Sequence, residues 1–557
     1  MDSYNNPNII LEVRFMQEKW YKEGVVYQIY PRSFKDSNSD GIGDVSGIIE
    51  KIPYLKEIGI DILWVSPIYK SPMVDNGYDI SDYYDINPEF GTLEDVKKLI
   101  KELHKADIKL VMDLVINHTS SEHEWFKRSI KKDGKYKDYY HWEDKPINWT
   151  GFFGQKAWTY NEDRKQYYLH LFAKEQPDLN YENKYVREDV KKIMRFWLDL
   201  GVDGFRCDVI NLIAKNNKYP KGKFSPILVG KEYYLNQPKL HDYLKEFNED
   251  VFSKYDMFTV GETVFIDTET AKLLTNPKRK ELNMIFQFDH MTSDCHYVKW
   301  FMKKFKPFNL KKPLSKWQNE LNGVGWNTLY LENHDQPRSI NRFGSLKYWY
   351  ESATMLATML YFQQGTPFIY QGQEIGMTNA SFTNLDDYKD LETHNIYKLG
   401  RKFLFSHKRM MKKIMNMSRD NGRTPMQWDN TTNGGFSEGE PWIKLNPNYI
   451  DINVKKQIND ESSVLSYYKK IIKLRKEYRT IIYGNYIDID FMNKKIYSYK
   501  RYDDNYELII ICNFVDKSYK FDITKYKEYK LLLTNYKDNY DDFLKPYEAR
   551  VYIKKYK

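Results

Sequence analysis

The chain has 557 residues, of which 41% are hydrophobic and 16% aromatic, and it carries a formal net charge of +9. This length exceeds one ordinary domain but suits a large elaborated barrel with a second domain beside it. The positive charges are spread along the chain and do not interleave with aromatic residues in a basic track, which argues against a nucleic-acid partner.

The cysteines and the apolar segments indicate the compartment. Cys207, Cys295 and Cys512 have no spacing typical of a disulfide framework or a structural zinc site. The N-terminal sequence MDSYNNPNIILEVRF lacks the apolar core and cleavage site of a signal peptide. No run of about eighteen apolar residues predicts a membrane helix. We therefore expect a soluble, cytoplasmic, monomeric protein with no membrane partner.

Short apolar runs alternate with longer amphipathic segments, a rhythm typical of strand–helix repeats. Helical patterns cover residues 44–59, 92–107 and 187–201. The candidate strands are residues 25–30, 60–65, 109–114, 204–207, 258–260, 284–288, 328–330 and 367–370. Eight such strands predict an α/β fold with a closed (β/α)8 TIM barrel.

Two segments fall outside this rhythm. Residues 119–183 are too many for a simple connection, and they are rich in aromatic residues, Gly and Pro. We predict that they form an inserted domain after the third strand, leaving residues 1–118 and 184–478 to the catalytic barrel. From about residue 479 to residue 557, alternation with period two predicts antiparallel strands and hence a C-terminal β-sandwich.

Polar residues follow four of the predicted strands, at the end where a barrel places its chemistry. They are Asp113, Asn117 and His118, then Arg206 and Asp208, then Glu262, and finally His334 and Asp335. Glycoside hydrolysis needs such carboxylates because its transition state resembles a sugar cation. One carboxylic acid protonates the leaving oxygen, and a second carboxylate attacks the sugar or activates water.

The local sequence predicts different protonation states for two of these carboxyls. Arg206 lies two residues before Asp208 on a strand, so both side chains point the same way. We expect the guanidinium to lower the pKa of Asp208 and keep it ionised. Glu262 follows an apolar run, and partial burial would raise its pKa as an acid requires. Cys207 points away from this site and is expected to pack in the core.

These four strand ends, in this order, resemble the conserved regions of glycoside hydrolase family 13, the α-amylase family, and the likeness covers nearly the whole chain. The resemblance implies that Asp208 is the nucleophile, Glu262 the acid/base and Asp335 the transition-state stabiliser. It also implies retention of the α configuration and no cofactor for catalysis.

The same resemblance implies a set of sugar-binding residues. His118 and His334 would hydrogen-bond the sugar in the cleavage subsite, supported by Arg206, and Tyr78 would stack on the sugar ring. Phe153 of the predicted insert is a further expected sugar contact.

Finer motifs, QPDLN at 176–180 and SPMVDNGYDISDY at 71–83 among them, are similar to those of the oligo-1,6-glucosidase group. They imply a glucose pocket closed by a salt bridge from Asp75 to Arg419, with Arg423 as the alternative partner. Such a pocket accepts only a chain end. Val209, directly after the nucleophile, resembles the residue found in enzymes that prefer α-1,6 bonds.

Residues 36–44 place oxygen ligands at alternate positions around a glycine turn, as hard cations require. Gly47 stands where a calcium hand has Glu, so this is not a helix–loop–helix site. Similar loops in the subfamily bind a structural Ca²⁺ or Mg²⁺, and the corresponding ligands here are Asp36, Asn38, Asp40, the carbonyl of Ile42, and Asp44.

The resulting hypothesis is a retaining, exo-acting α-glucosidase that hydrolyses α-1,6 bonds of isomaltose-type oligosaccharides from the non-reducing end. A transglucosidase such as sucrose isomerase or trehalose synthase is the alternative, as is trehalose-6-phosphate hydrolase, although the sequence has no distinct phosphate-binding cluster. A catalytically inactive binding subunit is a remote alternative. Glu332 stands where many relatives carry Asn, which leaves the preference for the leaving group open.

Overall fold

The computed structural model describes residues 18–556 except 226, 297 and 539–541. Eight parallel strands form one sheet, and a bridge between Ile285 and Asn327 joins its two edges into a closed barrel. In spatial order they are β11 (Met284–Phe286), β10 (Phe258–Glu262), β9 (Gly204–Cys207), β5 (Lys109–Leu114), β2 (Ile62–Val65), β1 (Val26–Ile29), β15 (Thr366–Tyr370) and β14 (Thr328–Leu329). The predicted (β/α)8 barrel and its eight strands are confirmed.

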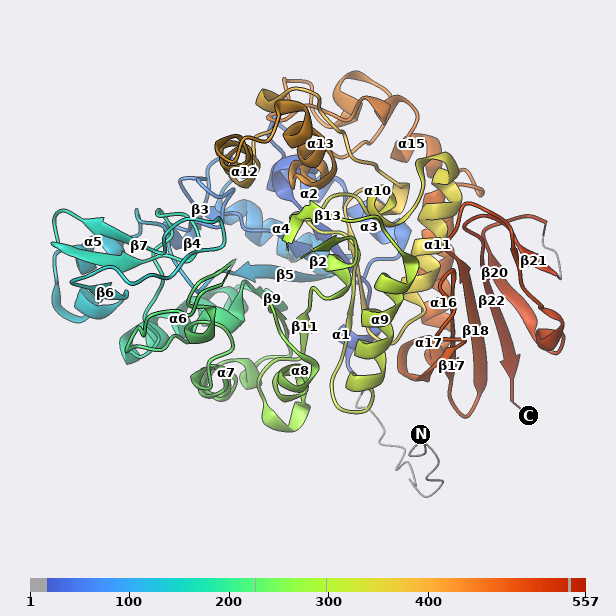
Figure 1. The fold of residues 1–557 in the computed structure, drawn as a ribbon, viewed down its shortest axis with the longest axis horizontal. Helices are drawn as coiled ribbons and strands as arrows, with labels where there is room; N and C mark the ends of the chain where they lie inside the picture. The colour runs from blue at the N-terminus through green and yellow to red at the C-terminus, as the bar shows by residue number, and fades with distance from the viewer. Residues whose placement is uncertain (1–17, 226, 297, 539–541, 557) are drawn as a thin grey trace.

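Helices surround the barrel (Figure 1). The main ones are α2 (Val45–Glu50), α3 (Ile52–Ile58), α4 (Leu93–Lys105), α6 (Lys184–Asp199), α7 (Lys239–Asp250), α8 (Thr268–Thr275), α9 (Pro307–Leu321), α11 (Trp349–Tyr361) and α16 (Val464–Glu477). α4 begins with a capping box between Thr92 and Asp95. The pattern at 44–59 predicts one helix, but the structure has two, because Pro53 lacks the N–H that would continue the first.

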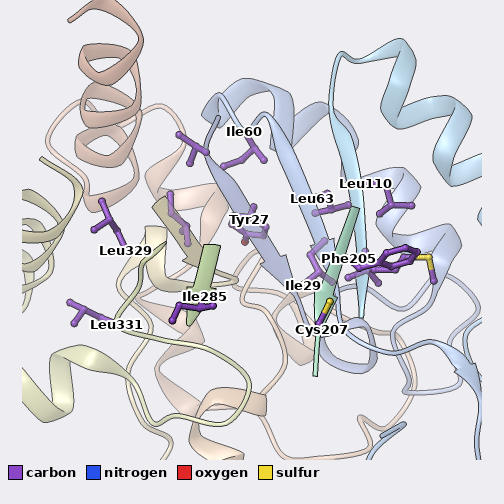
Figure 2. Close-up of a cluster of buried hydrophobic side chains, with 14 of the residues drawn as sticks. Tyr27, Ile29, Ile60, Leu63, Leu110, Phe205, Cys207, Ile285, Leu329 and Leu331 are labelled. Carbon is purple, nitrogen blue, oxygen red and sulfur yellow. The ribbon is translucent and has the colours of Figure 1, made fainter. Parts of the chain in front are cut away.

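Side chains along the barrel strands alternate between two separate hydrophobic clusters. Tyr27, Leu63, Leu110, Phe205 and Cys207 belong to the cluster that also contains the apolar face of α4 (Figure 2). The intervening residues, Val26, Ile62, Trp64, Val111, Phe258 and Val260 among them, fill the barrel interior. Arg206, Asp113 and Glu262 follow the interior register, so alternation directs them inward at the ends of their strands.

A segment with its own sheet leaves the barrel after β5, the third barrel strand. It contains α5 (Glu124–Ile130) and an antiparallel sheet of β6 (Trp142–Glu143), β8 (Gln166–Leu169) and β7 (Trp158–Asn161). A two-stranded sheet of β3 (Tyr69–Lys70) and β4 (Asp82–Ile86) lies in the loop after β2. Figure 1 shows this region at one end of the long axis of the molecule.

The C-terminal domain lies at the opposite end (Figure 1). Its main sheet is antiparallel, in the order β16 (Asn485–Ile489), β17 (Ile496–Tyr502), β18 (Tyr506–Asn513), β22 (Ala549–Lys555) and β20 (Lys530–Thr534). A second, smaller sheet pairs β19 (Tyr519–Lys520) with β21 (Phe543–Leu544). A hydrophobic cluster that includes Ile509, Ile511 and Leu544 joins the two layers. None of the helices in the described part of the chain has the length and apolar character needed to cross a membrane.

The remaining elements cover the rim of the barrel and the chain's connections. They are α1 (Trp20–Glu23), β12 (Cys295–His296), β13 (Val298–Met302), α10 (Ser339–Phe343), α12 (Leu391–Lys402), α13 (His407–Met417), α14 (Asp420–Arg423), α15 (Val454–Gln457) and α17 (Arg479–Tyr483).

Candidate active site

Arg206, at the end of β9, is the centre of the polar cluster inside the barrel. Its Nη1 lies 2.7 Å from Asp208 Oδ1 and 2.9 Å from Asp113 Oδ1, and its Nη2 contacts Glu262. All four side chains are buried. One guanidinium therefore holds three carboxyl groups from three neighbouring strand ends.

The electrostatics of Asp208 differ from the sequence-based expectation. Burial raises its pKa well above the ordinary value, and although Arg206 opposes this, the neighbouring carboxyls of Glu262 and Asp113 raise it further. The expectation that Arg206 alone would keep the pKa of Asp208 low is thus wrong, because the guanidinium is shared among three acids. Asp208 and Glu262 are also in hydrogen-bonding contact, which favours the protonated form of Asp208.

His334 links the barrel interior to Asp335. Its Nδ1 accepts a hydrogen bond from Gln28 Nε2 at 2.7 Å, and its Nε2 lies 2.8 Å from the hydroxyl of Tyr78 and 3.2 Å from Asp335 Oδ2. The rings of His334 and Tyr78 are stacked, with centroids 5.4 Å apart, and the hydroxyl of Tyr78 donates to Asp113. One face of Tyr78 is therefore already covered by a protein ring.

Two arginines face Asp335 from the other side. Arg419 Nη1 and Arg423 Nη2 lie 3.1 and 2.9 Å from Asp335 Oδ1. Burial opposes ionisation of Asp335, but His334 and these two guanidinium groups hold its pKa well below the ordinary value. Asp335 is therefore a fixed negative charge in this site.

Arg419 is also the residue that reaches Asp75. The distance from Arg419 Nη2 to Asp75 Oδ1 is 3.5 Å, and a shorter contact of 2.6 Å joins Arg419 to Asp390. Arg423 instead contacts Asp335 and lies 3.6 Å from Asp390. Of the two arginines left open by the sequence, the structure brings Arg419 beside Asp75.

Two aromatic residues of the inserted segment line the same wall. The ring of Phe153 lies 5.7 Å from the guanidinium carbon of Arg419 and 5.9 Å from the ring of Phe172, which in turn lies 5.2 Å from His118. His118 Nε2 is 3.0 Å from the carbonyl oxygen of Tyr78. The insert therefore places apolar surface next to the charged residues of the barrel.

Val209 has an unusual backbone. Its φ of 34° and ψ of 41° are left-handed, a conformation that is costly for a β-branched residue. Its side chain is buried against the insert, and its N–H points at Glu262 Oε2 at 3.3 Å. The turn after Asp208 thus supplies a backbone donor to the acid on the next strand.

Several residues of the site were not assigned a role from the sequence. Gln176 donates to Asp75 at 3.3 Å, and the buried Lys215 Nζ lies 2.7 Å from both Asp178 and Asn117. Gln28 could have been found, because it is an inward-facing polar residue in an apolar strand. Asp390 has no such signal, since it follows a long irregular segment.

Glu332, which departs from the family pattern, is buried away from solvent. Its Oε2 accepts from Arg338 at 3.1 Å, and its Oε1 accepts from the N–H and hydroxyl of Ser339 at 2.8 and 2.6 Å. Both carboxylate oxygens of Glu332 therefore anchor the loop after Asp335.

The loop predicted to bind a cation is folded by its own polar side chains. Asp36 Oδ1 accepts from the N–H of Asn38 at 2.9 Å, Asn38 from that of Asp40 at 2.9 Å, and Asp40 from that of Ile42 at 2.8 Å. Asp44 caps α2. These residues offer the oxygen donors that a hard cation prefers, but the carboxylate oxygens of Asp36, Asp40 and Asp44 do not all gather within 4.8 Å of one another.

Among the described residues, the acidic side chains whose oxygens do come within 4.8 Å of one another are Glu188, Glu246 and Asp250. Lys191 Nζ lies 2.6 to 2.9 Å from all three carboxylates. The ammonium group of Lys191 therefore neutralises these carboxylates, as a bound cation otherwise would.

Carboxyls gathered at the strand ends of a barrel supply the acid and the nucleophile that glycoside hydrolysis needs, and this is the class of enzyme to which the site corresponds. The family model described as "Alpha amylase, catalytic domain" matches residues 28–484, and the chain belongs to this family. It is 52% identical to an oligo-1,6-glucosidase of Parageobacillus thermoglucosidasius, over 96% of this chain and 99% of the relative.

Solved structures are similar over the whole chain as well. The trehalose-6-phosphate hydrolase of Bacillus licheniformis has a TM-score of 0.92 at 42% identity, covering 96% of this chain and all of that one. The isomaltulose synthase of Klebsiella sp. LX3 has a TM-score of 0.92 at 39% identity, covering 97% of this chain and all of that one. The same scaffold thus occurs in a hydrolase and in a synthase.

Proposed function

We propose that the protein is a retaining, exo-acting α-glucosidase that hydrolyses α-1,6 bonds of isomaltose-type oligosaccharides. The observation that carries the retaining mechanism is the direct contact between the carboxyls of Asp208 and Glu262, both held by Arg206. An inverting enzyme needs a larger gap between its two carboxyls for a water molecule. The likeness to an oligo-1,6-glucosidase at 52% identity supports the linkage.

In the first step, Asp208 attacks the anomeric carbon while Glu262 gives its proton to the leaving oxygen, so that a glucosyl ester forms and the glycosidic bond breaks. In the second step, Glu262 takes a proton from water, whose oxygen replaces Asp208 at the same carbon. Asp335, kept ionised by His334, Arg419 and Arg423, stabilises the positive charge of both transition states.

We infer cleavage at a chain end from the residues that form the wall of the pocket. Asp75 and Arg419 meet beside Asp335, and Phe153 covers the guanidinium of Arg419. In our proposal these residues, with His118 and Tyr78, enclose one terminal glucose and leave no passage for a continuing chain. Val209 contributes to the linkage preference from the side of the leaving group.

The test is incubation with isomaltose, maltose, sucrose, trehalose and trehalose 6-phosphate, with the products resolved by chromatography. We expect glucose from isomaltose at the highest rate. Isomaltulose from sucrose with little free glucose would instead identify a transglucosidase, and cleavage confined to trehalose 6-phosphate would identify a phosphate-dependent hydrolase. The Asp208→Asn variant is the control, since it should be inactive on every substrate at unchanged melting temperature.

We also propose that residues 36–44 bind a structural Ca²⁺ or Mg²⁺. Asp36, Asn38, Asp40, Asp44 and the carbonyl of Ile42 would hold the ion, which would fix the loop that precedes α2 and take no part in catalysis. Addition of Ca²⁺ or Mg²⁺ to chelator-treated protein should raise its melting temperature, and Asp40→Ala should remove that rise. An equal rise in the variant would place the ion elsewhere.

For the domain boundaries we keep those predicted from the sequence. The catalytic barrel comprises residues 1–118 and 184–478, the inserted domain residues 119–183, and the C-terminal domain residues 479–557. We propose that the protein acts as a monomer in the cytoplasm. Light scattering of the purified protein during gel filtration measures its molar mass and so tests whether it is a monomer.

A further inference from the structure

The hairpin formed by α12 and α13 has an apolar tip that faces solvent. Leu399, Phe403 and Leu404 are 44, 66 and 92% exposed. Leu404 stands in the turn between the helices with a φ of 61°, which is costly for leucine. Isolated exposed leucines are ordinary, but here three large apolar side chains are exposed close together in the sequence, at one turn.

The hairpin is firmly braced, so its tip has a defined shape. The hydroxyl of Tyr397 on α12 lies 2.9 Å from Nδ1 of His407 on α13. Gly400 lets the two helices approach closely, since a side chain there would meet Met410. Arg401 donates to the carbonyl of Phe405 at 2.8 Å. The exposed residues are therefore presented by a folded element.

Cations surround this tip. Residues 393–418 contain no Asp or Glu, and they contain seven basic residues: Lys398, Arg401, Lys402, Lys408, Arg409, Lys412 and Lys413. All but Lys413 are exposed. Lys413 lies over the ring of Phe301 on the neighbouring β13, and Phe301 is itself 53% exposed. The positive charge, although spread over the chain as a whole, is here concentrated on one structural element.

The tip lies away from the catalytic residues. α12 begins after Asp390, which contacts Arg419, and its twelve residues extend about 18 Å toward the tip. Figure 1 shows α12 and α13 at the outer edge of the molecule. Substitutions at the tip can therefore be tested without altering the pocket.

We propose that the tip of this hairpin, residues 398–409, binds an anionic lipid bilayer surface. Five exposed cations, Lys398, Arg401, Lys402, Lys408 and Arg409, complement phosphate headgroups. Phe403 and Leu404 would enter the boundary between headgroups and acyl chains, where their apolar surface leaves water. A nucleic acid would satisfy the cations but would leave Leu404 exposed, so the lipid surface fits the combination better. This inference does not depend on the proposed activity, and it departs from the sequence-based expectation of no membrane partner.

The test is flotation of the full-length protein with vesicles of phosphatidylcholine alone or of phosphatidylcholine with phosphatidylglycerol. We expect binding to the anionic vesicles, release by added salt, and little binding to phosphatidylcholine. Phe403→Ser with Leu404→Ser should weaken binding at least tenfold. Leu346→Ser with Met492→Ser, which removes two other exposed apolar residues that are 56 and 70% exposed, should change it less than twofold.

A second pair of variants tests the charges. Lys398→Gln, Arg401→Gln and Lys402→Gln together should weaken binding roughly 100-fold, since three contributions of about 1 kcal/mol are lost. Lys131→Gln, Lys132→Gln and Lys137→Gln, all exposed on the inserted segment, are the matched control and should leave binding unchanged. Circular dichroism verifies that each variant is folded.

Three results would overturn the proposal. The first is equal binding to both kinds of vesicle, and the second is anionic binding that survives loss of Phe403 and Leu404. The third is tighter binding to a uridine homopolymer than to anionic vesicles, with no effect of the apolar substitutions, which would assign the basic face to nucleic acid.

Discussion

Replacing Asp113 with Asn should shift the acidic limb of the pH–rate profile to lower pH. Asp113 and Asp208 each have an oxygen within 2.9 Å of the same nitrogen of Arg206, so these oxygens are at most about 6 Å apart. At an effective dielectric constant of about 20, two negative charges at that distance repel by about 3 kcal/mol, which equals about two pKa units. Removing one charge lets Asp208 ionise more readily.

The expected shift is smaller than this limit, because burial also raises the pKa of Asp113 and it is partly neutral in the acidic range. We therefore expect the acidic limb of kcat/KM, which reports ionisation of the free enzyme, to move down by about one to two pH units. Asn can keep both neighbours, with its oxygen accepting from Arg206 and its amide donating to Tyr78.

The assay is hydrolysis of a chromogenic α-glucoside across the acidic range, with Glu374→Gln as the control. Glu374 is also a buried carboxyl, but it lies after β15 against Tyr27 and Tyr54, so its loss should not move the limb. An acidic limb that is unchanged in Asp113→Asn, or displaced to higher pH, would refute the reasoning that neighbouring carboxyls raise the pKa of Asp208.

Further predictions concern binding and stability. Asp75→Ala removes a carboxylate from the pocket while Arg419 keeps Asp390, so kcat/KM for isomaltose should fall roughly 100-fold, a loss of about 3 kcal/mol in transition-state binding, with little change in melting temperature. A large drop in melting temperature would show a structural role instead. Burial raises the pKa of Glu374 although Tyr27 and Tyr54 donate to it. Its contribution to stability is therefore present below its unfolded pKa and is lost as pH rises through the folded pKa. Glu374→Gln should gain stability relative to the parent as pH rises above about 5, as measured by thermal unfolding. A difference that does not change with pH would contradict this.

The barrel could be predicted from the sequence because buried parallel strands are short apolar runs separated by amphipathic helices. The polar strand ends followed from the same pattern, since Arg206 and Glu262 interrupt runs that are otherwise apolar. The break between α2 and α3 arises at Pro53. The effect of a proline on a helix is local, so this break can be predicted from the sequence.

The rest of the site depends on contacts between distant segments. Arg419 and Asp75 are 344 positions apart, and Asp390 joins them from an irregular segment with no periodic signal. The direction of the pKa shift of Asp208 could also be found only from the structure. Arg206 two residues away suggested a lowered pKa, but the sequence did not show that Asp113 and Glu262 share the same guanidinium.

The most direct measurement of the central claim is the site of covalent labelling in the Glu262→Gln variant. An activated α-glucosyl donor, whose leaving group needs no acid, should glucosylate Asp208, and the ester should accumulate because the variant lacks the base that activates water. Peptide mass mapping should then find one glucosyl group on the peptide that contains Asp208. A label on Asp113 or Asp335, or turnover with inverted product and no covalent species, would contradict the assignment.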